Sequence, residues 1–255
     1  MTSAQTMLRW MLGACLASIA GCASSGEKPL TAPRAIVAPY DATGGEVLWA
    51  VVPLANESGA READKANVSD KVVAAIEEVR GLRCVPLNRT ILAMRTLGMT
   101  SVRSPGDVRR LADAMGVDGV VVGAVTAYDP YTPVIGLSIA LYSGNGSLRR
   151  GAPGTDPHDL VAKPTETTTP ARATRDLPMS SASEHLDAKN HQVLMDLRAY
   201  AEGRHEAPSA LGWKRYTASM DLYTQFAAYH VVDRLLQSEW VRLAREDGRG
   251  EQESR

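Results

Sequence analysis

Residues 118–128 read Asp-Gly-Val-Val-Val-Gly-Ala-Val-Thr-Ala-Tyr, a long apolar run with four valines. Its length and its β-branched side chains predict a strand that is buried on both faces. A turn with two prolines follows at residues 129–133, and apolar side chains then alternate through residues 134–142. This alternation predicts a second strand, paired antiparallel with the first.

The chain before this hairpin alternates strand and helix patterns. Continuous apolar runs predict strands, whereas apolar side chains spaced by three and four, followed by glycine, predict helices. The sequence Ser104-Pro105-Gly106-Asp107 is a good helix start, because Ser can accept the free backbone amides and Asp suits the positive helix end. The expected elements, in chain order, are a strand at residues 46–54, a helix at 64–80, a strand at 82–86, a helix capped by Asn88 that runs to Leu97, and a helix at 104–115.

We therefore expect an α/β fold: a three-layer-like βαβααββ domain over residues 46–142, with a mixed sheet. Residues 143–183 contain five prolines and a threonine-rich run, which predicts a disordered or mobile insertion. Residues 184–246 predict helices that pack on this core, because apolar side chains recur at spacings of three and four, with Glu239 on the polar side. Residues 247–255 are expected to form a polar, frayed tail.

The composition argues against several classes of function. The net charge is -1, 22% of the residues are charged and the basic residues are scattered, so we expect no nucleic-acid partner. Of the three cysteines, Cys15 and Cys22 lie near the amino terminus, and Cys84 lies among apolar residues that predict a buried side chain. The cysteines and histidines do not have the spacing of a metal site, so we predict neither a metal nor a cofactor.

The sequence gives no enzyme signature. Residues 136–140 nearly match the nucleophile elbow of hydrolases, but the apolar alternation runs straight through Ser138, which predicts a strand interior. The loop after Pro53, with Asn56-Glu57-Ser58-Gly59, is a place where a ligand could sit, although it is not a phosphate-binding loop. The candidate contacts to a partner are Trp213, Tyr216, Tyr223 and His230. The alternative for these side chains is that they pack against the core of the protein.

The amino terminus has the pattern of a secretory signal. Arg9 precedes an apolar run, residues 10–20, that is too short to span a bilayer as a helix. Residues 19–22, Ile-Ala-Gly-Cys, resemble the lipobox of bacterial lipoproteins. The resemblance implies a signal peptide over residues 1–21, acyl chains on Cys22 that hold the protein on a membrane, and a flexible tether over residues 22–45. Because Ala and not Asp follows the cysteine, it also implies an outer-membrane lipoprotein that faces the periplasm.

Two stretches resemble one group of bacterial envelope domains. Residues 51–59 fit the opening V-x-P-[FL]-x-N-x-S-G, and residues 111–125 fit a helix that ends in glycine before an acid-x-V-V-x-G-x-V strand. The group includes the amino-terminal domain of TolB-like proteins, the curli-secretion protein CsgG and the lipoprotein LpoB. The resemblance covers residues 47–142 and implies a protein-binding domain without catalytic residues.

The chain departs from each member of this group. Residues 143–183 do not have the alternating polarity of membrane-spanning pore strands such as those of CsgG. The expected tether is shorter than that of LpoB, and the helical carboxyl-terminal part is not the propeller of TolB. We therefore expect a lipid-anchored, non-enzymatic protein that docks another envelope protein, as a cell-wall synthesis regulator or an assembly or secretion accessory factor. The alternative is a small-ligand-binding protein or hydrolase that uses the loop after Pro53.

Overall fold

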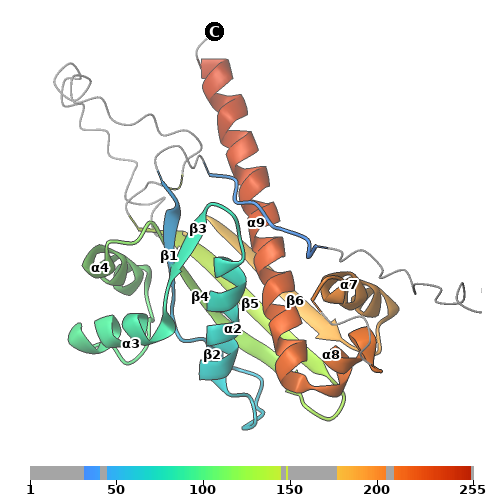
Figure 1. Ribbon diagram of the computed structural model, residues 1–255. Coiled ribbons are helices and arrows are strands. Elements are labelled where there is room, and N and C mark those ends of the chain that lie inside the picture. Colours follow the sequence, from blue (N-terminus) through green and yellow to red (C-terminus); the bar gives the residue numbers. More distant parts are fainter. Residues whose placement is uncertain (1–31, 41–44, 145–147, 149–176, 205–209, 254–255) are drawn as a thin grey trace, which may run out of the picture. The chain divides into compact units, whose positions relative to one another are not determined.

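The computed structural model describes residues 32–40, 45–144, 148, 177–204 and 210–253, which from Pro33 onward belong to one compact unit. Within these residues, a six-stranded mixed sheet has the order β3-β1-β4-β5-β6, and the short β2 pairs with β4 (Figure 1). The β1, β2, β3 and β4 strands pair in parallel, whereas β5 and β6 add antiparallel strands. The strands are β1 (Val47–Val51), β2 (Ala55–Asn56), β3 (Leu82–Val85), β4 (Gly119–Asp129), β5 (Val134–Ser143) and β6 (Ser180–Asp187).

Helices lie on both faces of this sheet, which confirms the expected α/β fold. The α2 and α9 helices cover one face, which we call the sealed face, while α3 and α4 pack on the opposite side, against β1 and β4. The helical segments are α2 (Lys65–Glu77), α3 (Leu87–Thr96), α4 (Pro105–Met115), α7 (His191–Ala201), the 3₁₀ turn η2 (Gly212–Lys214), α8 (Arg215–Ala218) and α9 (Met220–Glu253).

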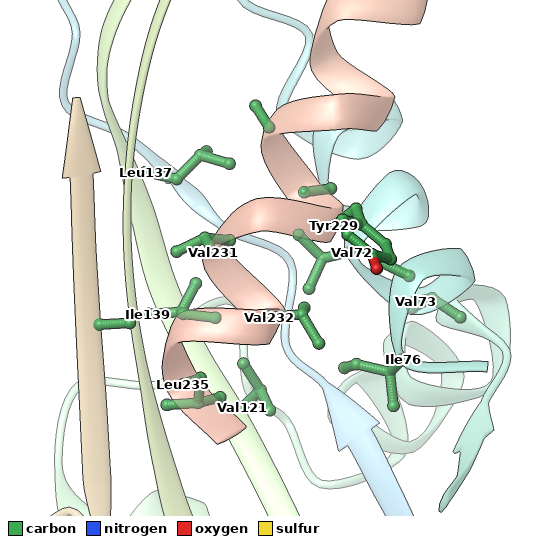
Figure 2. Close-up of a cluster of buried hydrophobic side chains, with 14 of the residues drawn as sticks. Val72, Val73, Ile76, Val121, Leu137, Ile139, Tyr229, Val231, Val232 and Leu235 are labelled. Carbon is green, nitrogen blue, oxygen red and sulfur yellow. The ribbon is translucent and has the colours of Figure 1, made fainter. Parts of the chain in front are cut away.

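The main hydrophobic core lies between the sealed face and its two helices. Figure 2 shows side chains from β4, β5, α2 and α9 that meet in this layer. Most of these side chains are Val, Leu or Ile, as expected for a chain with a single Phe. The labelled side chains are Val72, Val73, Ile76, Val121, Leu137, Ile139, Tyr229, Val231, Val232 and Leu235.

The predicted helix ends are mostly confirmed. In α4, the Ser104 side chain accepts from the Asp107 amide while the Asp107 side chain accepts from the Ser104 amide, and Gly116 ends the helix at a φ of 64°. Gly tolerates this left-handed conformation because it has no Cβ. The cap of α3 was predicted wrongly, since the helix begins at Leu87, ahead of Asn88, and its cap residue Pro86 makes no side-chain hydrogen bond.

The predicted insertion at residues 143–183 is wrong at its carboxyl end, because Ser180–Asp187 form β6. The strand pairs with β5 in a continuous register that includes Ser138 opposite Ser183. Its serines and alanine give no β-branched signal in the sequence, so backbone pairing to β5 stabilises it instead. The helical part predicted over residues 184–246 consequently begins with half of a strand. Leu148 is also fully buried, whereas residues 145–147 and 149–176 lie outside the described residues.

The predicted tether at residues 22–45 is wrong for residues 33–40, which we call the strap. Ile36, Ala38 and Tyr40 of the strap are buried in the main core. The Ala38 amide donates to the Arg80 carbonyl, and the Arg80 amide donates to the Ile36 carbonyl, both at 2.9 Å. The strap is therefore part of the fold, held by an isolated β-bridge next to β3.

The two ends of the chain differ in what can be described. The predicted signal peptide at residues 1–21 and Cys22 lie outside the described residues. At the other end, the tail expected from residue 247 continues as helix, since α9 extends to Glu253. None of the helices in the described ranges is both long enough and apolar enough to cross a membrane.

Candidate functional site

The described helices cover only half of the second sheet face. The α3 and α4 helices pack on β1 and on the start of β4 through a small apolar cluster that includes Ala50, Leu111 and Val120. Toward β5 and β6, the described residues place no helix on this side, and Ser181 and Ser183 of β6 are exposed. We call this half the open face. Its side chains, which share one side by register and alternation, are Val122, Ala124, Ser138, Ala140, Tyr142, Ser181 and Ser183.

A groove of about 650 Å³ lies along the open face. Its floor is formed by β4 and β5 residues such as Ala124 and Ala140, and its sides by two loops, residues 53–57 and 100–102. Lys65, the first residue of α2, also lines it. The loop after Pro53 thus lines a hollow, at the position where the sequence analysis placed a ligand site.

Hydrogen bonds within the loop after Pro53 fix its shape. The side-chain nitrogen Nδ2 of Asn56 donates to the Ala60 carbonyl at 2.8 Å. The side-chain oxygen of Asn56 accepts from the Ser58 backbone amide at 3.1 Å and from the Ser58 hydroxyl at 2.7 Å. Gly59 follows at a φ of 75°, in the left-handed region that favours glycine. The Asn, Ser and Gly of this motif therefore build the loop rather than offer free groups to a ligand.

The described lining of the groove holds few groups for acid–base chemistry. Among its lining residues, Glu57 and Lys65 are ionisable apart from the Tyr142 phenol, and the lining contains no histidine, aspartate or cysteine. Ser138 lies inside β5, as predicted, and no hydrogen bond joins it to an imidazole in the described part of the chain. A hydrolase needs a base within hydrogen-bond reach of its nucleophile. In the same part of the chain, no group of three His, Cys, Asp or Glu side chains could hold a metal ion.

Two of the four predicted partner contacts belong to the core. Tyr216 and Tyr223 are 4% and 0% exposed, and they pack in an aromatic cluster with Tyr200 and Phe226. This position contradicts a contact role for them, because a docked protein cannot reach a buried ring. The apolar stripe of α9 packs on the core, as the sequence predicted, with Tyr223 and Phe226 buried.

The other two predicted contacts are partly buried. Trp213 lies in η2 and packs against the main core. The His230 side chain is 13% exposed and its Nε2 lies 3.7 Å from a Glu184 carboxylate oxygen. Burial lowers the pKa of His230, and the Glu184 carboxylate only partly offsets this effect. These two positions fit the alternative that they pack against the core.

Cys84 has the role expected from its apolar neighbours. It is buried, and burial together with the nearby Glu77 carboxylate raises the pKa of its thiol to about 12. A thiol with a raised pKa stays protonated and is a poor nucleophile. Cys84 therefore supplies packing rather than chemistry.

Sequence analysis missed a buried polar network between the strap and α9. The Tyr40 hydroxyl donates to Glu239 at 2.9 Å, and Arg242 binds both oxygens of Glu239 at 2.9 and 2.8 Å. Glu239 is fully buried, so its predicted place on the polar side of the helix is wrong. Burial and the Glu239 carboxylate raise the pKa of Tyr40 above its usual range. The signal was present, since Glu239 lies between Leu236 and Leu243 at the helical spacing of the apolar stripe.

No protein-family model matches the chain, and no curated protein matches its sequence significantly. Several solved structures are similar to it. The LpoB C-terminal domain from Salmonella enterica is 12% identical, with 55% of this chain and 82% of that chain covered, at a TM-score of 0.36. A lipoprotein from Neisseria meningitidis is 16% identical, with 58% and 91% covered, at a TM-score of 0.38. A hypothetical protein from Chlamydia trachomatis is 13% identical, with 76% and 98% covered, also at a TM-score of 0.38.

These identities and TM-scores are low, and they assign no function to the chain. The open face, the groove and the strap are the features of this chain that bear on its function.

Proposed function

We propose that this chain is a lipid-anchored, non-enzymatic envelope protein that docks another envelope protein on its open face. The observation that carries the proposal is the half-covered sheet: β5 and β6 present uncharged side chains toward a groove that has no acid–base set. A sheet face that no helix covers presents its row of side chains where a partner can reach them. In this role the chain regulates an enzyme of cell-wall synthesis or assists an assembly or secretion machine, and the partner is the protein that it regulates or assists.

The strap supports a membrane-proximal partner. Because residues 33–40 pack on the domain, at most the eleven residues 22–32 connect the domain to an anchor on Cys22. At about 3.5 Å per extended residue, eleven residues reach at most about 40 Å. If Cys22 is acylated, the open face then works within a few tens of ångströms of the membrane, and we propose the outer membrane, facing the periplasm.

Lipidation is tested by mass spectrometry of the mature amino terminus. We expect a chain that begins at Cys22 and carries acyl groups on it. An unmodified Cys22, or cleavage at another residue, contradicts the anchor and with it the proposed location.

Docking on the open face is tested by placing a charge there. Ala140→Glu puts a negative charge on the uncharged floor of the groove, so we expect loss of the protein that cross-links to this chain in the intact envelope. Ala74→Glu is the matched control, because Ala74 is exposed on α2 over the other face. Retained cross-linking in the Ala140 variant, with loss in the Ala74 variant, would place the docking surface elsewhere.

Small-ligand binding is the second candidate, because the groove volume falls within the range of about 300–1,000 Å³ that small-molecule sites occupy. Glu57 and Lys65 would orient such a ligand. A thermal-shift screen of envelope metabolites separates the two candidates. A ligand that raises the melting temperature of the native chain but not of Glu57→Gln or Lys65→Met favours binding of a small molecule.

A further inference from the structure

The layer formed by α3 and α4 is basic, although the whole chain is almost neutral. Residues 86–116 contain five arginines against two aspartates, whereas the net charge of the chain is -1. The exposed arginines of this layer form no salt bridge with any other residue that the structure describes. By contrast, Arg34 beside α9 and Arg234 and Arg242 within α9 are all paired with carboxylates. The four exposed arginines are Arg89, Arg95, Arg103 and Arg110.

An apolar side chain lies in the middle of these cations. Leu92 is 60% exposed and is three residues from both Arg89 and Arg95 on α3. Residues three apart lie side by side on a helix, so this face presents a leucine between two guanidinium groups. The opposite side of α3 is used for packing, since Leu87 and Met94 are buried. The exposed face of α3 is therefore not required by the fold.

Part of this basic layer lies beside the groove, although Leu92 is on the side of α3 opposite to Met94, which lines the groove. The loop that joins α3 to α4 supplies the groove residues 100–102. The Arg103 Nε donates to the Ser101 hydroxyl at 3.0 Å, which holds that guanidinium at the rim. Lys65 lies in the lining together with a single carboxylate, Glu57. The floor of the groove is thus uncharged, whereas its sides carry Lys65 and Arg103 together with Glu57 and Asp107, and Asp107 accepts a hydrogen bond from the Arg103 amide.

We propose that the docked partner is an acidic protein segment. Its small or apolar side chains lie on the open face, and its carboxylates meet Arg103 beside the groove and the other exposed arginines on the outer side of α3 and α4. Guanidinium groups bind carboxylates with two parallel hydrogen bonds, and arginine is enriched where partners bind tightly. This inference rests on the proposed docking function and adds the charge of the partner to it.

The strap argues against an anionic membrane as the occupant of this basic layer. The Tyr229 hydroxyl donates to the Arg34 carbonyl at 3.1 Å, so the chain leaves the domain beside α9, on the sealed side of the sheet. A helix, a sheet and a second helix stacked at about 10 Å each are about 30 Å thick. A chain that reaches at most about 40 Å would have to be almost fully extended to bring the outer face of α3 onto the bilayer. Loss of that much chain entropy favours a partner that approaches from the other side.

The test is site-specific photo-cross-linking of the full-length protein in the intact envelope. The cross-linker is placed at position 92, at position 140 on the open face, and at position 195 as a control, because Met195 is exposed on α7. We expect positions 92 and 140 to capture the same protein, through a segment that mass spectrometry maps as net negative. We expect Arg89→Gln with Arg95→Gln to reduce the cross-linking yield at position 140 roughly tenfold, because charges at the edge of an interface raise the rate at which the partners associate.

The matched control is Lys189→Gln with Arg198→Gln, which removes two exposed cations from the β6–α7 turn and from α7. It should leave the yield unchanged, and the urea midpoint of each variant checks that the fold is intact. Three outcomes overturn the acidic partner but not the docking function. They are a lipid adduct at position 92, a captured segment that is not net negative, and a cross-linking yield that does not change when Arg89 and Arg95 are replaced. Absence of any protein adduct at both 92 and 140 overturns the docking function itself.

Discussion

The β5 strand has two faces with different roles. On one face, Leu137, Ile139 and Leu141 are buried under α9, in the main core. On the other face, Ser138, Ala140 and Tyr142 are partly exposed along the groove. Because successive side chains of a strand point to opposite sides, one backbone can supply stability and a binding surface residue by residue. Sensitivity to mutation should therefore alternate along this strand.

Removal of the Glu239 carboxylate should have the largest effect. Glu239→Ala removes the acceptor of the Tyr40 hydroxyl and of two Arg242 hydrogen bonds beneath the strap, and leaves the Arg242 cation with Glu246 and the Leu148 carbonyl alone. Loss of one partner from a buried ion pair costs about 3–5 kcal/mol, so we expect a large fall in the urea midpoint. Glu246→Ala is the control, because Glu246 binds the same arginine from an exposed position and such pairs contribute about 1 kcal/mol or less. Equal effects of the two variants would show that the buried pair does not stabilise the sealed side.

Two neighbouring residues of β5 give the sharpest test of the comparison. Ile139→Ala should destabilise the protein by about 2–5 kcal/mol, since it leaves a cavity in the main core. Ser138→Ala, one residue earlier on the open face, should change the free energy of unfolding by no more than about 0.5 kcal/mol. Urea denaturation of both variants measures the difference. Similar losses at both positions would mean that the open face also carries the stability of the fold.

The strap should weaken when its hydroxyl is removed. Tyr40→Phe deletes the hydrogen bond to Glu239, and a bond to a charged group contributes about 1.5–3 kcal/mol. We expect faster hydrogen exchange at the Ala38 amide, which donates to Arg80 in the native fold. Tyr131→Phe is the control, because Tyr131 is almost fully exposed in the β4–β5 turn. Unchanged exchange at Ala38 in the Tyr40 variant would show that the strap is held without this network.

The smallest effect concerns pH. His230 has a pKa below its ordinary value of about 6.5, because burial disfavours the charged ring. The unfolded chain therefore binds the proton more readily, and stability should fall as the pH drops below about 6.5 toward the lower pKa of the folded state. His230→Gln should flatten the pH dependence of the urea midpoint in this window. His185→Gln, on the exposed side of β6, should leave that dependence as it is in the native protein.

The sequence predicted the central elements well because their signals are local. The β4 and β5 runs, the glycine after α4 and the cap at Ser104 each follow from a few adjacent side chains. The β6 strand was missed because its serines carry no strand signal, and pairing to β5 supplies the stability instead. The strap was missed because its prolines suggested a linker, although Ile36, Ala38 and Tyr40 alternate as a half-buried extended segment does.

The candidate site was predicted in part. The loop after Pro53 was singled out from sequence, and it does line the groove. The partner contacts at Tyr216 and Tyr223 were wrong because a helical apolar stripe does not reveal whether its aromatic rings face a core or a partner. The basic layer was not recognised, since its arginines are scattered in sequence and gather only when α3 and α4 pack together.

The strap also gives the molecule a mechanical property. Tension applied at Pro33 reaches the Arg34 bond to Tyr229 first, then the pair of bonds to Arg80, and last the charged bond of Tyr40 to Glu239. We expect these hydrogen bonds to break in sequence under tension, because they lie one after another along the strap and do not share the force. Each broken contact frees two or three residues of the strap, and complete release of residues 33–40 lengthens the connection to the attachment point by about 25 Å, at about 3.3 Å per residue. The domain can thus be pulled farther from its attachment point before the force reaches β1 and the sheet.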